Sequence, residues 1–116
     1  MGQLTSHVLD TTHGTPAAGV KIDLYSLAQG RVQIKSFVTN ADGRCDQSML
    51  NADEIKSGQW ELVFHVGDYF AGKNIAAGDT PFLDEVPVRF GIDDSDAHYH
   101  VPLLVSPWSY TTYRGS

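Results

Sequence analysis

Short runs of alternating apolar and polar residues, rich in Val, Ile, Thr and aromatic side chains, make up most of this chain. Turn residues separate these runs, and Asn40-Ala41-Asp42-Gly43 supplies the left-handed backbone positions that a hairpin needs. Because successive strand residues point to opposite faces, the alternation predicts strands with one buried face. The pattern favours an all-β sandwich of two sheets. The predicted strands are Leu4–Asp10, Val20–Leu27, Arg31–Thr39, Arg44–Gln47, Trp60–Val66, Glu85–Ile92, His98–Ser106 and Ser109–Tyr113.

One short helix is predicted to interrupt the strands. It begins at Asn51, whose side chain can cap a helix, with Glu54 placed as in a capping box. Gly58 follows as a stop signal, so the helix is expected to have about two turns. The segment from Gly67 to Pro81 has three glycines and little periodicity, and it is predicted to be a mobile connection with at most a short strand.

Length and charge narrow the class of protein. A chain of 116 residues suits one domain, residues 1–116, with a single core. The net charge of −6 and the eight scattered Lys and Arg residues argue against nucleic-acid binding. No apolar run approaches the roughly 20 residues that span a bilayer, and no secretory signal is visible. We therefore expect a cytoplasmic protein that binds neither nucleic acid nor a membrane.

The strand faces that point away from the core carry unusual residues. In His98–Ser106 one face is typical core, whereas the other carries imidazoles, a proline and aliphatic side chains. Such a half-apolar face predicts a pocket or a contact with a partner subunit. The first and last strands repeat this pattern. If they share a sheet with His98–Ser106, one patch results from His7, Leu9, His100, Pro102, Leu104, Thr111 and Tyr113.

Two terminal motifs make the prediction more specific. They are LTSHVLD from Leu4 to Asp10, and HYHVPLLVS from His98 followed by Tyr113-Arg114-Gly115-Ser116. Together they resemble the 5-hydroxyisourate hydrolases, the enzyme branch of the transthyretin-like family, over almost the whole chain. The resemblance implies a transthyretin-like, two-sheet antiparallel sandwich that forms a homotetramer, a dimer of dimers, with a central channel. The implied channel lining is His7, Leu9, Arg44, His100, Pro102, Leu104, Thr111 and Tyr113.

The resemblance also implies an activity. The family hydrolyses 5-hydroxyisourate, a purine-derived small molecule, to 2-oxo-4-hydroxy-4-carboxy-5-ureidoimidazoline in urate degradation. The implied catalytic residues are His7, Arg44 and His100, and substrate contacts fall on His7, Arg44, Tyr113 and Ser116. Two imidazoles, a guanidinium and a phenol can activate water and stabilise an oxyanion. We therefore expect neither a metal nor a cofactor.

Two other functions stay open. A transthyretin-type carrier would bind a thyroid-hormone-like ligand in the channel, but carriers have lysine in place of His7, glutamate in place of Arg44, and threonine in place of His100 and Tyr113. A structural or interaction module is the second alternative, because a fold alone does not fix function.

The other histidines and the acidic run receive structural interpretations. His13 and His65 are expected to be hydrogen-bonded structural residues. The run from Asp93 to Asp96 lacks a full metal-ligand pattern and is expected to be a solvated turn.

Overall fold

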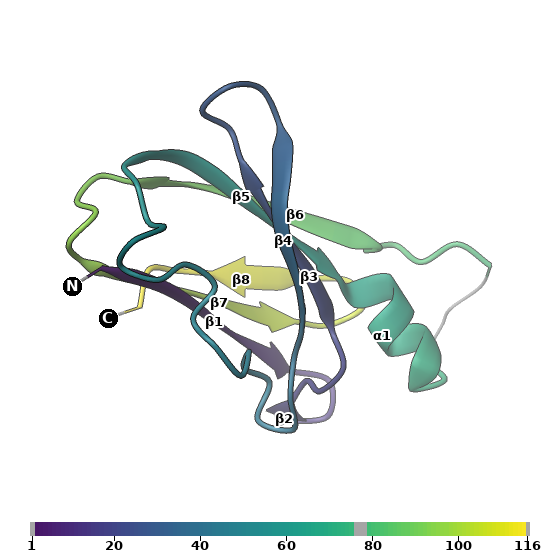
Figure 1. Cartoon of the computed structure of the whole chain (residues 1–116). Coiled ribbons are helices and arrows are strands. Elements are labelled where there is room, and N and C mark those ends of the chain that lie inside the picture. The colour runs from purple at the N-terminus through teal and green to yellow at the C-terminus, as the bar shows by residue number, and fades with distance from the viewer. Residues whose placement is uncertain (1, 76–78, 116) are drawn as a thin grey trace.

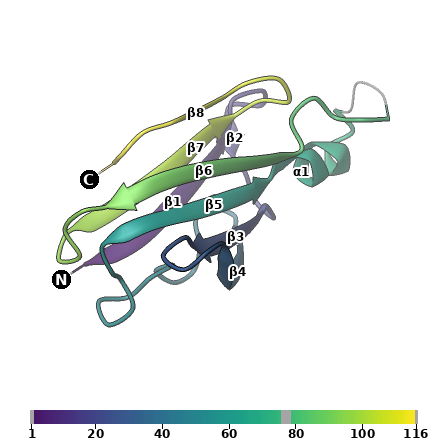
Figure 2. The same ribbon diagram turned by 90° about the horizontal axis from the view of Figure 1, so that it is seen from above.

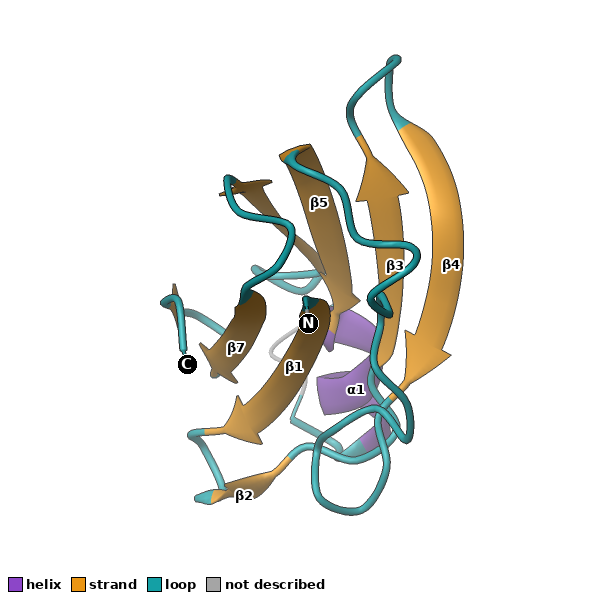
Figure 3. Ribbon diagram, turned by 60° about the vertical axis from the view of Figure 1, so that its left-hand side comes forward, coloured by secondary structure: helices purple, strands orange, loops and turns teal. Residues whose placement is uncertain are grey.

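The computed structural model describes residues 2–75 and 79–115. Its elements are β1 (Gln3–Asp10), β2 (Thr15–Pro16), β3 (Lys21–Ser26), β4 (Val32–Val38), β5 (Gly58–His65), α1 (Val66–Gly72), β6 (Glu85–Ile92), β7 (His98–Val105) and β8 (Tyr110–Thr112). The strands form sheet A, with the order β2-β1-β7-β8, and sheet B, with the order β4-β3-β5-β6. The two sheets pack face to face (Figures 1 and 3). The predicted all-β sandwich is confirmed.

Strand pairing brings both ends of the chain into sheet A. β1 and β7 pair in parallel, from Gln3 opposite His98 to Asp10 opposite Val105. This parallel pair is an exception to the predicted antiparallel arrangement, which holds for the other strand pairs in the described part of the chain. β8 then pairs with β7, with Thr111 opposite Leu104. The condition for a shared patch is therefore met.

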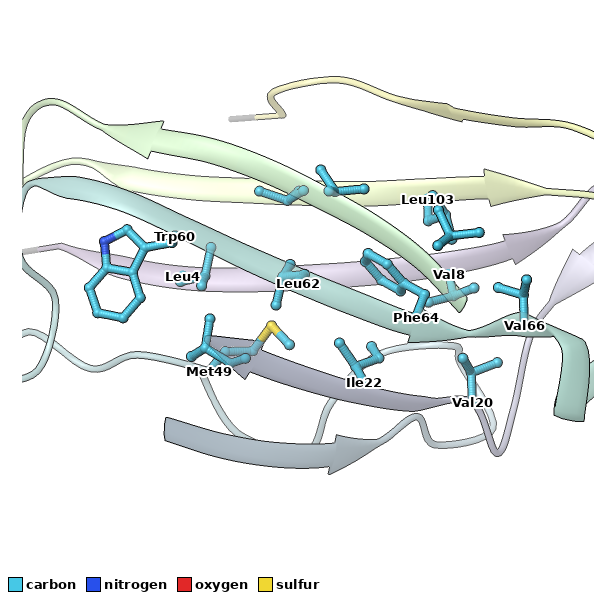
Figure 4. Packing of buried hydrophobic residues seen from close by; sticks show 14 of the residues in the cluster. Leu4, Val8, Val20, Ile22, Met49, Trp60, Leu62, Phe64, Val66 and Leu103 are labelled. Atoms are coloured by element: carbon cyan, nitrogen blue, oxygen red, sulfur yellow. The ribbon is translucent and has the colours of Figure 1, made fainter. Parts of the chain in front are cut away.

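The core lies between the sheets, as Figure 4 shows. Sheet A contributes to the core the side chains that the alternation predicted. On β7 these buried residues are Tyr99, Val101, Leu103 and Val105. From sheet B the largest fully buried side chain is that of Phe64. Burying one such aromatic or aliphatic side chain is worth about 1.5–3 kcal/mol. This burial fixes the register of β1 and β7, because a slip of one residue would turn the core face outward.

The helix predicted after Asn51 is wrong. The capping-box contact does form, because the Asn51 N–H donates to Glu54 Oε1 at 3.0 Å, and the Ile55 N–H donates to the Asn51 carbonyl at 2.9 Å. Only turns follow, and β5 begins at Gly58. A segment this short gains too few helical hydrogen bonds to offset the cost of nucleation. The Glu54 carboxylate is also drawn to Lys35 of β4 by an ion pair of 2.5 Å.

The helix is instead α1, which begins at Val66, the last residue of the predicted strand Trp60–Val66, and runs into the predicted connection. The Tyr69 and Phe70 side chains of α1 are buried, and their rings make an edge-to-face contact with centroids 5.0 Å apart. The Tyr69 hydroxyl donates to the buried Asp10 carboxylate at 2.8 Å. Tertiary contacts thus hold a segment whose two glycines disfavour a helix. Residues 76–78 of the predicted connection lie outside the described residues.

α1 and the start of sheet A lie at opposite ends of the sandwich. Figures 1 and 2 place the beginning of β1 and the segment after β8 together, far from α1.

The predicted strand Arg44–Gln47 is wrong, because this segment makes only an isolated bridge, from Arg44 to His7. Within residues 2–75 and 79–115, no helix is long and apolar enough to cross a membrane.

Candidate active site

The predicted patch lies on the outer face of sheet A. In the β1–β7 pair, Thr5 lies opposite His100, and Leu9 opposite Leu104. His7 lies opposite Pro102 in the same pair. These residues alternate with the buried core positions, so their side chains leave the sheet on its other side. The patch therefore combines histidines near the start of β7 with apolar residues further along the strand.

A tight turn after β4 brings Arg44 to this face. The side-chain oxygen of Asn40 accepts the N–H groups of Asp42 at 2.9 Å and Arg44 at 3.2 Å. The Asn40 N–H in turn donates to the Arg44 carbonyl at 2.7 Å. The backbone of Arg44 then pairs with His7 in an antiparallel bridge. Asn40 therefore positions Arg44, a role that the sequence analysis missed although it identified the turn.

Gly43 makes this close approach possible. Its φ is +75°, and an added Cβ would overlap the carbonyl oxygen of Val8 and lie 3.3 Å from the His7 ring. Gly43→Ala is expected to lower the free energy of unfolding. The loss should exceed the cost of a left-handed backbone conformation for a non-glycine residue, which is about 1–2 kcal/mol. Urea unfolding measures this loss.

The matched control for Gly43 is Gly30→Ala. Gly30 has a similar φ of +79° but open space around its Cβ position. The overlap at Gly43 should make its variant at least about 1 kcal/mol less stable than the control. Equal losses at the two sites would contradict the close approach.

Two hollows flank the histidines of β7. The Arg44 hollow has a volume of about 440 Å³ and is lined by Thr5, Ser6, Arg44, Cys45, Asp46, Gln47, Ser48, His98 and His100. The C-terminal hollow, of about 710 Å³, is lined by His98, His100, Tyr113, Arg114 and Gly115. His98 and His100 are common to both hollows. Within one chain they therefore stand between Arg44 and Tyr113.

The structure brings the predicted site residues together unevenly. Arg44 and His100 share a hollow, and His7 lies beside Arg44 without lining either hollow. Tyr113 shares only the C-terminal hollow with His100. Ser116, which the sequence analysis assigned to substrate binding, lies outside the described residues.

Burial and charge favour the neutral form of two histidines. The pKa of His100 is lowered by burial, and the positive charges of Arg44, His98 and His7 lower it further. Burial and the Arg44 charge also lower the pKa of His7, against an opposing effect of the Asp42 backbone and carboxylate. Both imidazoles can therefore accept a proton at neutral pH. By contrast, burial and then Asp46 raise the pKa of Cys45 to about 11, so its thiol is not a nucleophile there.

The other histidines and the acidic run have structural contacts, as expected. His13 and His65 contact the carboxylates of Asp10 and Asp23 at 2.6 and 2.8 Å. The Tyr99 hydroxyl accepts the N–H groups of Asp93 and Asp94, which shapes the acidic turn. Among the described residues, no three His, Cys, Asp or Glu side chains gather as a metal site.

Two residues at the hollows received no predicted role from the sequence. Thr5 lines the Arg44 hollow, and its place on the same strand face as His7 was the signal for it. Arg114 lines the C-terminal hollow and stacks its guanidinium 4.1 Å above the Tyr99 ring. No periodicity could predict that contact, because Arg114 lies beyond β8.

Comparison with known proteins adds an independent observation. The model of a family described as the HIUase/Transthyretin family matches residues 4–115. A 5-hydroxyisourate hydrolase of Pseudomonas aeruginosa is 50% identical over 117 residues, which cover 100% of this chain and 93% of that protein.

Three solved structures have the same fold. The 5-hydroxyisourate hydrolase of Klebsiella pneumoniae has a TM-score of 0.81 and 32% identity, covering 98% of this chain and 99% of its own. An (S)-allantoin synthase has a TM-score of 0.92 and 50% identity over 99% of this chain, which spans only 44% of that longer chain. Sea bream transthyretin in complex with thyroxine has a TM-score of 0.83 and 28% identity, covering 97% of this chain and 94% of its own.

Proposed function

This chain belongs to the HIUase/Transthyretin family, and we propose that it hydrolyses 5-hydroxyisourate to 2-oxo-4-hydroxy-4-carboxy-5-ureidoimidazoline in urate degradation. The observation that carries the proposal is the meeting of Arg44 with His7 and His100 on the outer face of sheet A. One fixed cation beside two imidazoles of lowered pKa suits the opening of a ring amide by water.

The histidines act on the water in this mechanism. His7 and His100 hold the water, and a neutral imidazole takes one of its protons as the oxygen attacks the ring carbonyl carbon. The ring C–N bond then breaks, and a proton returns to the leaving nitrogen. His100 is the better placed of the two, because it lines both hollows.

Arg44 acts on the substrate. The attacked carbonyl oxygen gains negative charge in the transition state, and a guanidinium offers it planar, charge-assisted hydrogen bonds. Among the described residues, the Arg44 side chain makes no ion pair with a carboxylate. Its charge is thus available to the oxygen edge of a flat, carbonyl-rich molecule.

The proposal includes a homotetramer, a dimer of dimers, whose channel is lined by the patch. Its apolar part, formed by Leu9, Pro102, Leu104 and Thr111, would face a second copy, and Tyr113 would reach the site of a neighbouring subunit. In support, Tyr113 is 56% exposed and separated from Arg44 by His98 and His100 in one chain. The proposed role of Ser116 is to hold the chain end at the site. Sedimentation equilibrium that finds only monomers would contradict the tetramer.

The test of the function is the decay of freshly generated 5-hydroxyisourate, followed by ultraviolet absorbance with and without the purified chain. We expect fast decay in the presence of the wild type and of a chelator, and its loss in His7→Ala. The alternative is a carrier, favoured by the likeness to transthyretin in complex with thyroxine. Thyroxine binding by a folded chain that does not accelerate the decay would replace the proposal by that alternative.

The proposed base predicts the pH dependence of the reaction. Because the folded-state pKa of His7 and His100 is lowered, both imidazoles are neutral at pH 7 and become protonated only in more acidic solution. kcat/KM is expected to be constant near neutral pH and to fall on acidification with a midpoint below about 6.5, the ordinary pKa of histidine. Rates measured from about pH 5 to about pH 8 check this expectation. A midpoint above the ordinary value would contradict it.

A further inference from the structure

A single hydroxyl group joins the two histidines of β7. Thr5 Oγ1 lies 2.8 Å from His98 Nε2 and 2.8 Å from His100 Nδ1. The register explains the geometry, because Thr5 of β1 lies opposite His100, and His98 is the next residue of β7 on the same face. The two rings stand edge to face, with centroids 6.3 Å apart, and they make no hydrogen bond to each other. Thr5 thus supplies the direct connection between them.

The His100 ring is held from two sides. Thr5 takes its Nδ1, and the backbone of Gly115 covers the Cδ2 edge. The Gly115 N–H donates to the His100 carbonyl at 2.7 Å, and a Cβ on residue 115 would lie 2.8 Å from His100 Cδ2. Nε2 is therefore the ring nitrogen of His100 left for water, and among the described residues it makes no hydrogen bond.

Hydrogen counting links the tautomers of the two histidines. A hydroxyl has one proton to donate, and a neutral imidazole has one N–H and one nitrogen lone pair. If Thr5 donates to His98 Nε2, it can accept the Nδ1–H of His100, which leaves the Nε2 lone pair of His100 free. If Thr5 donates to His100 instead, Nε2 of His100 carries the proton and cannot act as a base. The proposed hydrolysis requires the first arrangement.

We propose that the Thr5 hydroxyl relays a proton from His100 to His98 when water is activated, an inference that rests on the proposed function. As His100 Nε2 takes a proton from water, its Nδ1 proton passes to the Thr5 oxygen. The Thr5 hydroxyl proton then passes to His98 Nε2. The hydroxide bonds to the substrate carbonyl carbon, and the positive charge ends on His98. Thr5 and His98 thus act through His100, as positioning and relay residues.

The relay separates charge in a useful direction. Without it, the activated water would leave an imidazolium on His100, beside the positive charge of Arg44. Moving the proton to His98 takes the new charge two residues further along β7 from the position opposite His7, whose backbone pairs with Arg44. His98 lines both hollows, so the proton can leave to solvent or return to the product.

The kinetic test removes the hydroxyl and then restores it. Thr5→Val keeps the shape of the side chain without the hydroxyl, and Thr5→Ser keeps the hydroxyl. We expect Thr5→Val to lower kcat roughly tenfold to a hundredfold with little change in KM, because a proton-transfer step is affected. Thr5→Ser is expected to keep wild-type kcat. A Thr5→Val enzyme with wild-type kcat, in a wild type that hydrolyses the substrate, would overturn the relay.

The matched control is Thr11→Val. The Thr11 hydroxyl also bonds to β7, donating to the Val105 carbonyl at 3.1 Å, but at the other end of the strand pair. Its variant is expected to keep wild-type kcat, so a loss specific to Thr5→Val separates the relay from a general loss of a sheet hydrogen bond. An inactive wild type, by contrast, would contradict the proposed function itself.

A measurement on the wild type tests the relay without any variant or turnover. Nitrogen-15 NMR of the histidine rings distinguishes protonated from unprotonated ring nitrogens. In the neutral form of the two rings we expect both His98 and His100 as the Nδ1–H tautomers, with both Nε2 atoms unprotonated. Finding His100 with its proton on Nε2 would overturn the relay, whatever the kinetic result.

Discussion

Arg44→Ala is expected to lower kcat/KM for 5-hydroxyisourate by about 10²–10³-fold, the usual effect of removing one charge-stabilising group from an oxyanion site. Arg44 shares a hollow with His100, and its side chain pairs with no carboxylate in the described part of the chain. Both KM and kcat should change, because the guanidinium is proposed to hold the substrate and its transition state. Initial rates of 5-hydroxyisourate decay measure both quantities.

The matched control is Arg89→Ala. Arg89 lies on β6 and is largely exposed, and its partner Glu61 keeps a second ion pair, with Arg31 at 2.7 Å. Arg89 lines neither the Arg44 hollow nor the C-terminal hollow, so the kinetic constants should stay at wild-type values when its positive charge is removed. If Arg44→Ala had the kinetic constants of this control, Arg44 would not be the group that stabilises the oxyanion.

A second consequence of Arg44→Ala separates the effect of the Arg44 charge from the effect of its planar guanidinium. The Arg44 cation is one of the causes that lower the pKa of both His7 and His100. Its loss should therefore move the acidic midpoint of kcat/KM upward, toward the ordinary value of histidine. Arg44→Lys should leave that midpoint in place but not restore full activity, because an ammonium lacks the planar fork.

Alternation predicted the faces of the strands because one face is buried. Leu4 and Val8 are fully buried, while Thr5 and His7 between them are not, and β7 follows the same rule except at Pro102, which is buried on the outer face. Which strands become neighbours is a matter of long-range pairing. The parallel contact of β1 with β7 could therefore not be derived from either strand alone.

The elements predicted wrongly depend on contacts that no local pattern contains. The capping contact of Glu54 with Asn51 forms without a helix, because the chain turns at once into β5. α1 forms although its two glycines disfavour a helix, because the Tyr69 hydroxyl donates a hydrogen bond to Asp10, a residue far away in the sequence. Local sequence patterns thus predicted the short-range hydrogen bond correctly, and they failed where contacts with a distant residue determine whether a helix forms.

The candidate site was predicted from two sources. Periodicity placed His7 and His100 on one face, and the family resemblance added Arg44. The function of Thr5 was not visible in the sequence, because it depends on the register that sets the hydroxyl between two imidazoles. Positioning residues of this kind carry no motif of their own.

His100→Gln is expected to lower kcat by about 10²–10⁴-fold, the range that general acid–base catalysis supplies. The amide of Gln can still make hydrogen bonds, but it cannot accept a proton from water near neutral pH. KM should change less than kcat, since Arg44 still holds the substrate. Single-turnover rates, measured with saturating enzyme in excess over 5-hydroxyisourate, check the chemical step directly.

His13→Gln is the matched control for His100→Gln. His13 contacts the buried Asp10 at 2.6 Å, and hydrogen bonds from His13 and Tyr69 outweigh burial and lower the Asp10 pKa. This variant should therefore lose stability but not kcat. The two variants together separate an imidazole that stabilises the fold from one that moves a proton. If both variants kept wild-type kcat, His7 alone would have to activate the water. The relay through Thr5 would then be contradicted as well, because it requires His100 as the base.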